Sequence, residues 1–190
     1  MKYLLFLIPL FLISCSEQYS KEIINESPQI FEVDYFSKNI EKCFLESNYY
    51  FEGKVKILRK KSYKNSSYPD NKIVPYDLVF GWGIMSDPKI ILSLYSLYQE
   101  NRWYHYSWNK DFKYNPKEIK YSSDNIHIIP SNSFILKQIE NIKIGDIYYI
   151  QGYLVDLYCP TFKRISSKSL FDSGNGACEQ LYVEYLKHLN

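Results

Sequence analysis

The sequence contains none of the spacings that usually mark a metal or phosphate site. Its three histidines and four cysteines form no H-x-x-x-H and no C-x-x-C pair, the arrangements in which two side chains meet on one metal ion. It also has no G-x-G-x-x-G loop and no Gly-Lys-Ser/Thr phosphate loop, which excludes those two modes of nucleotide binding. We therefore expect neither a metal nor a cofactor.

An excess of one charge and long apolar runs are also missing. The 23 basic residues nearly balance the 21 acidic residues, for a formal net charge of +2, so no strong field would recruit nucleic acid. A basic stretch at 54–64 could follow a nucleic-acid backbone, but lysines equally protect the edge of a sheet from pairing. Beyond residue 15, no apolar run reaches the about 20 residues of a membrane helix. The case for nucleic acid is therefore weak.

The first fifteen residues, MKYLLFLIPLFLISC, are organised like an export signal. Lys2 precedes an apolar run at 3–13 that is too short to span a membrane comfortably. The closing quartet, 12–15, resembles a bacterial lipobox, in which the peptide is cut before the cysteine and the thiol is joined to diacylglycerol. The resemblance implies a signal peptide at 1–14 and a lipid anchor on Cys15. An ordinary signal peptide with an incidental cysteine is the alternative.

The same resemblance predicts a location in the bacterial cell envelope. Ser16, and not aspartate, follows the cysteine, which by analogy with Gram-negative lipoproteins favours a periplasm-facing position on the outer membrane. The partners expected are the membrane, through the lipid anchor, and an envelope protein or glycan. Residues 15–29 are polar and aperiodic, so we expect a lipidated cysteine followed by a flexible tether. Residues 30–190 are expected to form a single globular domain.

Periodicity and capping signals predict an α+β protein that is mostly β. A helical spacing of apolar residues predicts a helix within 30–48, Asp87-Pro88 is typical of a helix start, and 132–140 is a further short helix. Alternation or aromatic content predicts strands at 49–63, 72–82, 101–108, 126–129 and 142–158, with two more before the C-terminus.

Gly152 interrupts the clearest strand, 142–158, which indicates a bulge. The phrase KIGDIYYIQGYLV resembles small OB-folds. We predict a small antiparallel OB-like barrel of about five or six strands with two or three short helices.

Three cysteines remain once Cys15 is assigned to lipid. An exported location permits disulfides, and Cys159 and Cys178 lie at the ends of two predicted strands that one loop joins. A Cys159–Cys178 bridge would contribute about 3 kcal/mol in the chain-entropy model. Free buried cysteines are the alternative, and Cys43 has no assigned partner.

Three short phrases occur in the body of the chain: GWGIMSD at 81–87, NIHIIP at 125–130 and GACE at 176–179. Together they resemble a family of exported bacterial proteins of unknown function. The resemblance covers roughly residues 50 to 186 and implies that the phrases belong to one domain. It implies no activity.

The candidate binding residues are Trp82, Trp103, Asn125 and His127. In NRWYHYSW, alternation places Trp103 and His105 on one face of a strand, where aromatic rings could stack on a sugar, peptide or base. Asn125 would share a strand face with His127. Twenty tyrosines and eleven phenylalanines favour such a surface, although A+T-rich codons would produce the same excess. Trp82, between two glycines, is equally suited to the core.

These residues favour a non-enzymatic function: a ligand- or partner-binding domain. The alternative is a hydrolase of an envelope polymer that uses His127 or His105 with a nearby acid. Ser86 is no obvious nucleophile, because it lies outside a G-x-S-x-G elbow. No catalytic residue can be assigned from the sequence.

Overall fold

The computed structural model of the protein describes residues 19–172 and 178–189. The signal peptide expected at 1–14 and the lipidation site Cys15 lie outside these residues. Among the residues described, no helix is long and apolar enough to cross a membrane.

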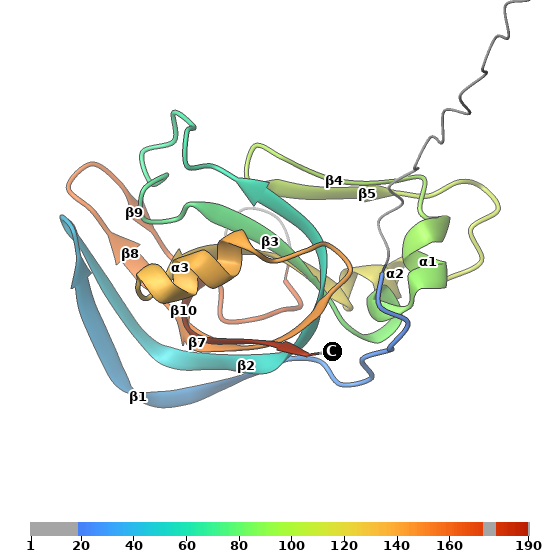
Figure 1. Ribbon diagram of the computed structural model, residues 1–190, viewed down its shortest axis with the longest axis horizontal. Helices are drawn as coiled ribbons and strands as arrows, with labels where there is room; N and C mark the ends of the chain where they lie inside the picture. The colour runs from blue at the N-terminus through green and yellow to red at the C-terminus, as the bar shows by residue number, and fades with distance from the viewer. Residues whose placement is uncertain (1–18, 173–177, 190) are drawn as a thin grey trace, which may run out of the picture.

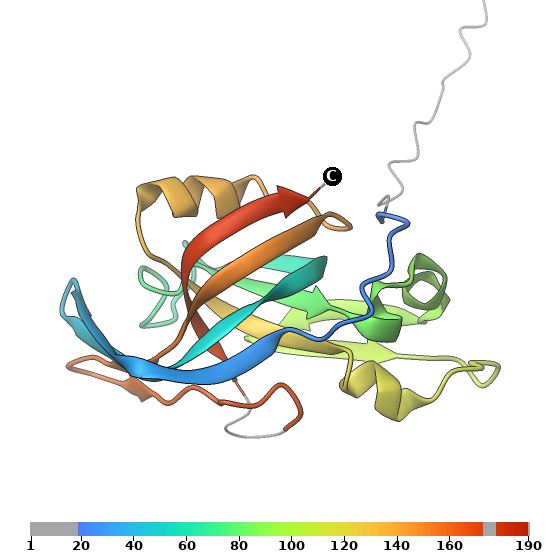
Figure 2. The same cartoon turned by 90° about the horizontal axis from the view of Figure 1, so that it is seen from below.

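Five strands close a barrel. They are β2 (Cys43–Ser62), β3 (Tyr76–Gly81), β6 (Ser123–Pro130), β7 (Ile147–Leu154) and β10 (Gln180–Leu189). Pairing runs β2–β3–β6–β10–β7 and returns to β2, so each strand has two neighbours and the circuit has no free edge. The β6–β10 pair is parallel and the other pairs in the circuit are antiparallel. The predicted α+β, mostly β barrel is confirmed, and the strands enclose a common interior (Figure 2).

The remaining elements decorate this barrel. The strands are β1 (Gln29–Ile40), β4 (Ser96–Glu100), β5 (Trp103–Ser107), β8 (Asp156–Tyr158) and β9 (Lys163–Arg164). The helical elements are a 3-10 turn, η1 (Gly83–Ser86), with α1 (Pro88–Ser93), α2 (Pro116–Lys120) and α3 (Ser133–Glu140). The helix α3 lies across the barrel, and the β4–β5 hairpin runs along its outside (Figure 1).

Strand alternation decides which side chains fill the barrel. The inward positions of β3, β6 and β10 are apolar and belong to the largest core cluster: Leu78, Phe80, Ile126, Ile128, Leu181 and Val183. Ile135 and Ile139 of α3 join this cluster from one end. At Gly152, a Cβ atom would lie 2.0 Å from the carbonyl oxygen of Tyr182. Glycine is required there because β7 and β10 approach too closely for any side chain, and the bulge between Val183 and Tyr185 lies opposite it.

The helix predicted within 30–48 is wrong. The segment instead forms β1 and the start of β2, joined by a tight turn at Glu41, whose φ is +53°. The helical spacing of its apolar residues is overridden by contacts from distant strands. Phe36, for example, stacks on Tyr153 of β7 with ring centroids 3.9 Å apart. The helix predicted after Asp87-Pro88 begins as expected, with Asp87 accepting the amide of Lys89, but ends at Ser93.

The described part of the expected tether, from residue 19 to 28, packs on the barrel. Tyr19 and Ile24 are buried. The amide of Ile24 donates to the hydroxyl of Ser86 at 2.7 Å, and its carbonyl accepts from the amide of Gly83. Lys56 donates to the carbonyls of Ser20 and Glu22. The sequence could not show this docking, because the segment is polar and these hydrogen bonds use its own backbone amide and carbonyl groups.

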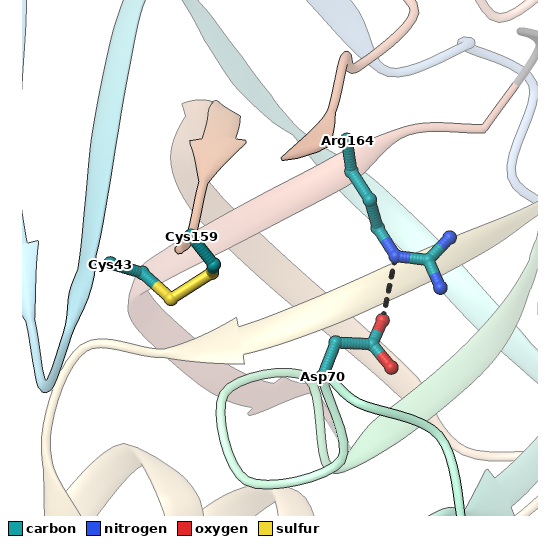
Figure 3. The surroundings of a disulfide bond; sticks show 4 residues. All are labelled: Cys43, Asp70, Cys159 and Arg164. Atoms are coloured by element: carbon teal, nitrogen blue, oxygen red, sulfur yellow. Dashed lines mark ion pairs between the residues drawn. A yellow bond between two sulfur atoms is a disulfide. The ribbon is translucent and has the colours of Figure 1, made fainter. Parts of the chain in front are cut away.

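The disulfide joins Cys43 to Cys159, so the predicted Cys159–Cys178 bridge is wrong (Figure 3). β2 and β8 pair through Phe44 and Tyr158, the residues next to these cysteines, which brings the two Cα atoms within 4.3 Å. Cys178 carries a free thiol and is half-buried.

Candidate functional site

A polar cluster lies on the outer face of β3, β6 and β10, opposite to the apolar interior. The register pairs Asp77 with His127 across β3 and β6, and Gln180 with His127 across β6 and β10. Alternation therefore turns these three side chains away from the core. All three are nevertheless buried, so the polar cluster is enclosed by the elements packed outside the barrel.

The β4–β5 hairpin is held over this face by polar contacts. The side-chain amide of Gln99 donates to Asn125 Oδ1 at 2.7 Å, and Asn125 Nδ2 donates to the carbonyl of Arg102 at 3.1 Å. The two-residue turn of the hairpin, Asn101 and Arg102, has φ values of +51° and +68°. Both residues are thus in the left-handed region that favours glycine. This turn directs the Arg102 side chain back into the protein.

Arg102 joins two buried carboxylates. Its Nη1 donates to Asp77 Oδ1 at 2.7 Å and its Nη2 to Asp70 Oδ1 at 3.2 Å. Its guanidinium lies over the ring of Tyr63, 3.9 Å from the centroid. Arg164 forms an ion pair with the other oxygen of Asp70 at 2.7 Å (Figure 3). These contacts hold Asp77 in place with little freedom, because each of its neighbours is itself fixed.

Asp77 in turn holds His127. The ring Nδ1 donates to Asp77 Oδ1 at 2.8 Å, and His127 is only 2% exposed. Burial alone would lower the pKa of His127, but the charge and hydrogen bond of Asp77, assisted by Cys178, raise it to about 9. His127 is therefore positioned through one nitrogen by a carboxylate and interacts with a thiol, an arrangement suited to proton transfer.

A pocket of about 240 Å³ opens beside this cluster. The hairpin contributes Trp103, Tyr104 and Tyr106 to its wall, and Asn125 and Cys178 line it from the barrel side. Ser123 and four charged residues complete the polar part of the lining: Arg102, Lys120, Asp124 and Asp172. The pocket thus offers aromatic rings, charges of both signs and one thiol in a small space.

Two acids at the edge of the pocket, Asp124 and Glu179, have raised pKa values. Burial raises the pKa of both, and the charge of Asp124 raises the pKa of Glu179 further. Asp124 also accepts the amide of Asn125 at 2.7 Å. The raised pKa values favour the uncharged form of these acids, so this edge of the pocket carries less negative charge than two carboxylates would give.

The structure brings three of the four candidate binding residues together. Trp103 and Asn125 line the pocket, and the backbone amide of His127 donates to the carbonyl of Glu179, the residue next to Cys178 of the lining. Trp82 is not a pocket residue: it is 2% exposed, and its indole donates to the carbonyl of Tyr121 in the core region. His105 is exposed, stacks on Tyr98, and does not line the pocket.

Sequence reasoning missed the residues that link the site together. Asp77 follows no motif, and its approach to His127 depends on the pairing of β3 with β6. In the sequence, Arg102 is only one residue of an aromatic strand. Cys178 belongs to the GACE phrase, but its place at the start of a predicted strand favours a disulfide with Cys159. Ser86 is buried, and its hydroxyl donates to the carbonyl of Gly83 and accepts from Ile24. Its role is to fix the N-terminal segment.

Comparisons with known proteins give this chain no family. No family model matches it, and neither a curated protein nor a solved structure is significantly similar to it. Within residues 19–172 and 178–189, no group of three or more histidine, cysteine or acidic side chains is arranged to hold a metal ion.

Proposed function

We propose that this chain is a lipid-anchored protein of the bacterial cell envelope whose barrel binds a ligand in the pocket beneath the β4–β5 hairpin. The observation that carries the binding proposal is the aromatic wall of Trp103, Tyr104 and Tyr106 beside Asn125. Aromatic faces next to a few fixed polar groups are the usual composition of a small ligand site. The pocket also lies against the start of β6, which contributes Ser123, Asp124 and Asn125 to its lining.

The ligand class that fits best is a cell-wall glycan with its attached peptide. The pocket is smaller than the about 300 Å³ at which sites for drug-sized molecules begin, so it accepts one ring or side chain of a larger molecule. Lys120 and Asp172 provide charges of opposite sign in the lining. A nucleic acid backbone would find no concentration of cations here, whereas a glycan bearing a zwitterionic peptide would find partners for both charges.

Replacing Trp103 by alanine is expected to weaken the binding of soluble peptidoglycan fragments at least tenfold, because a tryptophan in an interface often contributes about 2 kcal/mol or more. Isothermal titration calorimetry measures the change. Trp108→Ala is the matched control: Trp108 is 42% exposed and Trp103 is 43% exposed, but Trp108 does not line the pocket. Equal losses in both variants, or unchanged binding in Trp103→Ala, would contradict the proposed site.

Replacing Cys15 by serine is expected to abolish incorporation of labelled palmitate and to release the protein from the membrane fraction, because serine has no thiol to carry diacylglycerol. The measurement is metabolic labelling of the expressed chain followed by fractionation, with Cys178→Ser as the matched cysteine control. Labelling that persists in Cys15→Ser would reject the lipid anchor, and the envelope location would then need other support.

The alternative function, a hydrolase of an envelope polymer, is favoured by one specific contact. Of the two histidines considered, His127 has a nearby acid, Asp77, at 2.8 Å. His105 lies outside the pocket, so it is not proposed for this role. The hydroxyl of Ser86 is hydrogen-bonded to the backbone of Ile24 and Gly83, so a hydrolase would need another group as its nucleophile.

A further inference from the structure

The free thiol of the described chain lies where a nucleophile would be needed. Cys43 and Cys159 are bonded to each other, whereas Cys178 is free and half-buried. Cys178 lines the pocket together with Trp103, Tyr104 and Asn125. A thiol that served only to pack would be expected inside an apolar cluster, but this thiol borders an open pocket in a polar setting.

The imidazole beside this thiol is oriented by a carboxylate. His127 Nδ1 is engaged with Asp77 Oδ1 at 2.8 Å. Nε2 is buried and has no hydrogen-bond partner within the described part of the chain. The backbone amide of His127 donates to the carbonyl of Glu179 at 2.9 Å, and Gln180 pairs with His127 across β6 and β10. This pairing places Cys178, which lines the pocket, next to His127. Hydrogen bonds between catalytic groups are often long or poorly aligned before a substrate binds. One ring nitrogen is thus fixed, and the other is left to exchange a proton with Cys178.

Arg102 stabilises the carboxylate that orients the ring. Its guanidinium donates to Asp77 Oδ1 at 2.7 Å, and this charge-assisted hydrogen bond fixes Asp77 inside a buried cluster. Arg102 comes from the turn of the hairpin, Asp77 from β3 and His127 from β6, and Cys178 lies just before β10. Arg102 contacts Asp77 and Asp77 contacts His127, and the series ends with Cys178 at the pocket.

We propose that Cys178 is the nucleophile of a thiol-dependent acyl-transfer centre, with His127 as its acid–base partner and Asp77 as the residue that positions the imidazole. This activity goes beyond ligand binding. The same roles of nucleophile, base and orienting acid define the triads of acyl-transfer enzymes on unrelated folds.

The substrate class is an ester or amide whose acyl carbonyl enters the pocket. His127 holds the proton of the Cys178 thiol, and the thiolate sulfur attacks the carbonyl carbon and opens the C=O bond to an oxyanion. When the oxyanion closes again, the bond to the alcohol or amine breaks, and that leaving group takes the proton from His127. Water, activated by the neutral imidazole, then cleaves the thioester. The products are a carboxylic acid and the restored thiol, with no oxidant or reductant consumed.

The reactivity of Cys178 in the unaltered full chain gives the first test. We expect iodoacetamide to alkylate Cys178 at pH 6 about tenfold faster or more in the folded protein than in the urea-unfolded, non-reduced protein, because a thiol beside a protonated imidazole is activated. Peptide mapping by mass spectrometry reads Cys178 separately from Cys15. Slower alkylation in the folded protein would overturn the proposal, and this comparison needs no variant that must fold.

The second test is acyl transfer from 4-nitrophenyl acetate. We expect a burst of nitrophenol and one acetyl group on Cys178, both absent in Cys178→Ala. His127→Gln should lower the acetylation rate about 10²-fold or more. His105→Gln, which changes an exposed histidine outside the pocket, should leave the rate unchanged.

To test the positioning role of Asp77, the variant Asp77→Asn should change the pH profile of acetylation as well as its rate. An equal loss in both histidine variants, or no acetyl group on Cys178, would reject the centre. Because neither reagent requires the natural ligand, this proposal and the glycan-binding proposal can fail separately.

Discussion

Replacing Arg102 by methionine is expected to lower the free energy of unfolding by about 3–5 kcal/mol, the usual cost of removing one partner from a buried ion pair. Arg102 is 6% exposed and contacts Asp77 and Asp70, whose side chains are each at most 2% exposed. Without the guanidinium, Asp77 still contacts His127, and Asp70 still pairs with Arg164. Urea denaturation of the purified protein measures the change.

A surface cation on the neighbouring strand is the control for this prediction. Lys61 is exposed on β2, and its backbone pairs with that of Asp77. Lys61→Met should change the stability by no more than about 0.5 kcal/mol. Combining Arg102→Met with Asp77→Asn should cost less than the sum of the two single changes, since the second removes the charge that the first left unpaired. A loss below about 1 kcal/mol in Arg102→Met would contradict the structural role assigned to this cluster.

Removing the disulfide with the double change Cys43→Ala and Cys159→Ala is expected to lower the free energy of unfolding by about 4–5 kcal/mol in the chain-entropy model, because the bond closes a long loop. The two cysteines are 116 residues apart in sequence. Nearly the whole barrel lies within the loop, so the unfolded chain gains much freedom when the bond is absent. Chemical denaturation under non-reducing conditions measures the difference.

The control here is Cys178→Ala, which removes a free thiol and should change the stability by less than about 1 kcal/mol. A non-reducing peptide map provides an independent check of the connectivity. It should show Cys43 linked to Cys159 and Cys178 unlinked. A link between Cys159 and Cys178 in the map would reject both the disulfide and the free thiol on which the acyl-transfer proposal depends.

The GWGIMSD phrase shows how far local sequence can be interpreted. Its position at the end of a predicted strand and before Asp87-Pro88 indicates a junction, and the structure confirms this. Gly83 adopts a φ of +49°, and a Cβ atom there would lie 2.9 Å from the hydroxyl of Ser122. Asp87 caps α1. The phrase lies outside the pocket, so the role of its glycines is to let the backbone adopt the conformation of this junction.

The failed predictions share a cause: each concerned a partner far away in the sequence. Phe36, Ile40, Cys43 and Phe44 have helical spacing, but strands β7 and β8 offer pairing and a disulfide that a local pattern cannot reveal. The sequence predicts a bond between Cys159 and Cys178, the cysteine nearer to it along the chain. In the folded protein Cys159 is bonded to Cys43, which is nearer in space. The polar segment that begins at residue 19 docks through backbone hydrogen bonds and two isolated buried side chains, Tyr19 and Ile24, which form no periodic pattern.

Alternation of side chains and helix caps depend on neighbours within a few positions, so the amino-acid order alone was sufficient to predict a mostly β barrel with short helices. The candidate site is of another kind. Asp77, His127 and Cys178 are separated by about fifty residues each, and they meet because β3 and β10 both pair with β6. Barrel closure brings these strands together, and the folded hairpin then encloses the polar side chains that alternation turned outward.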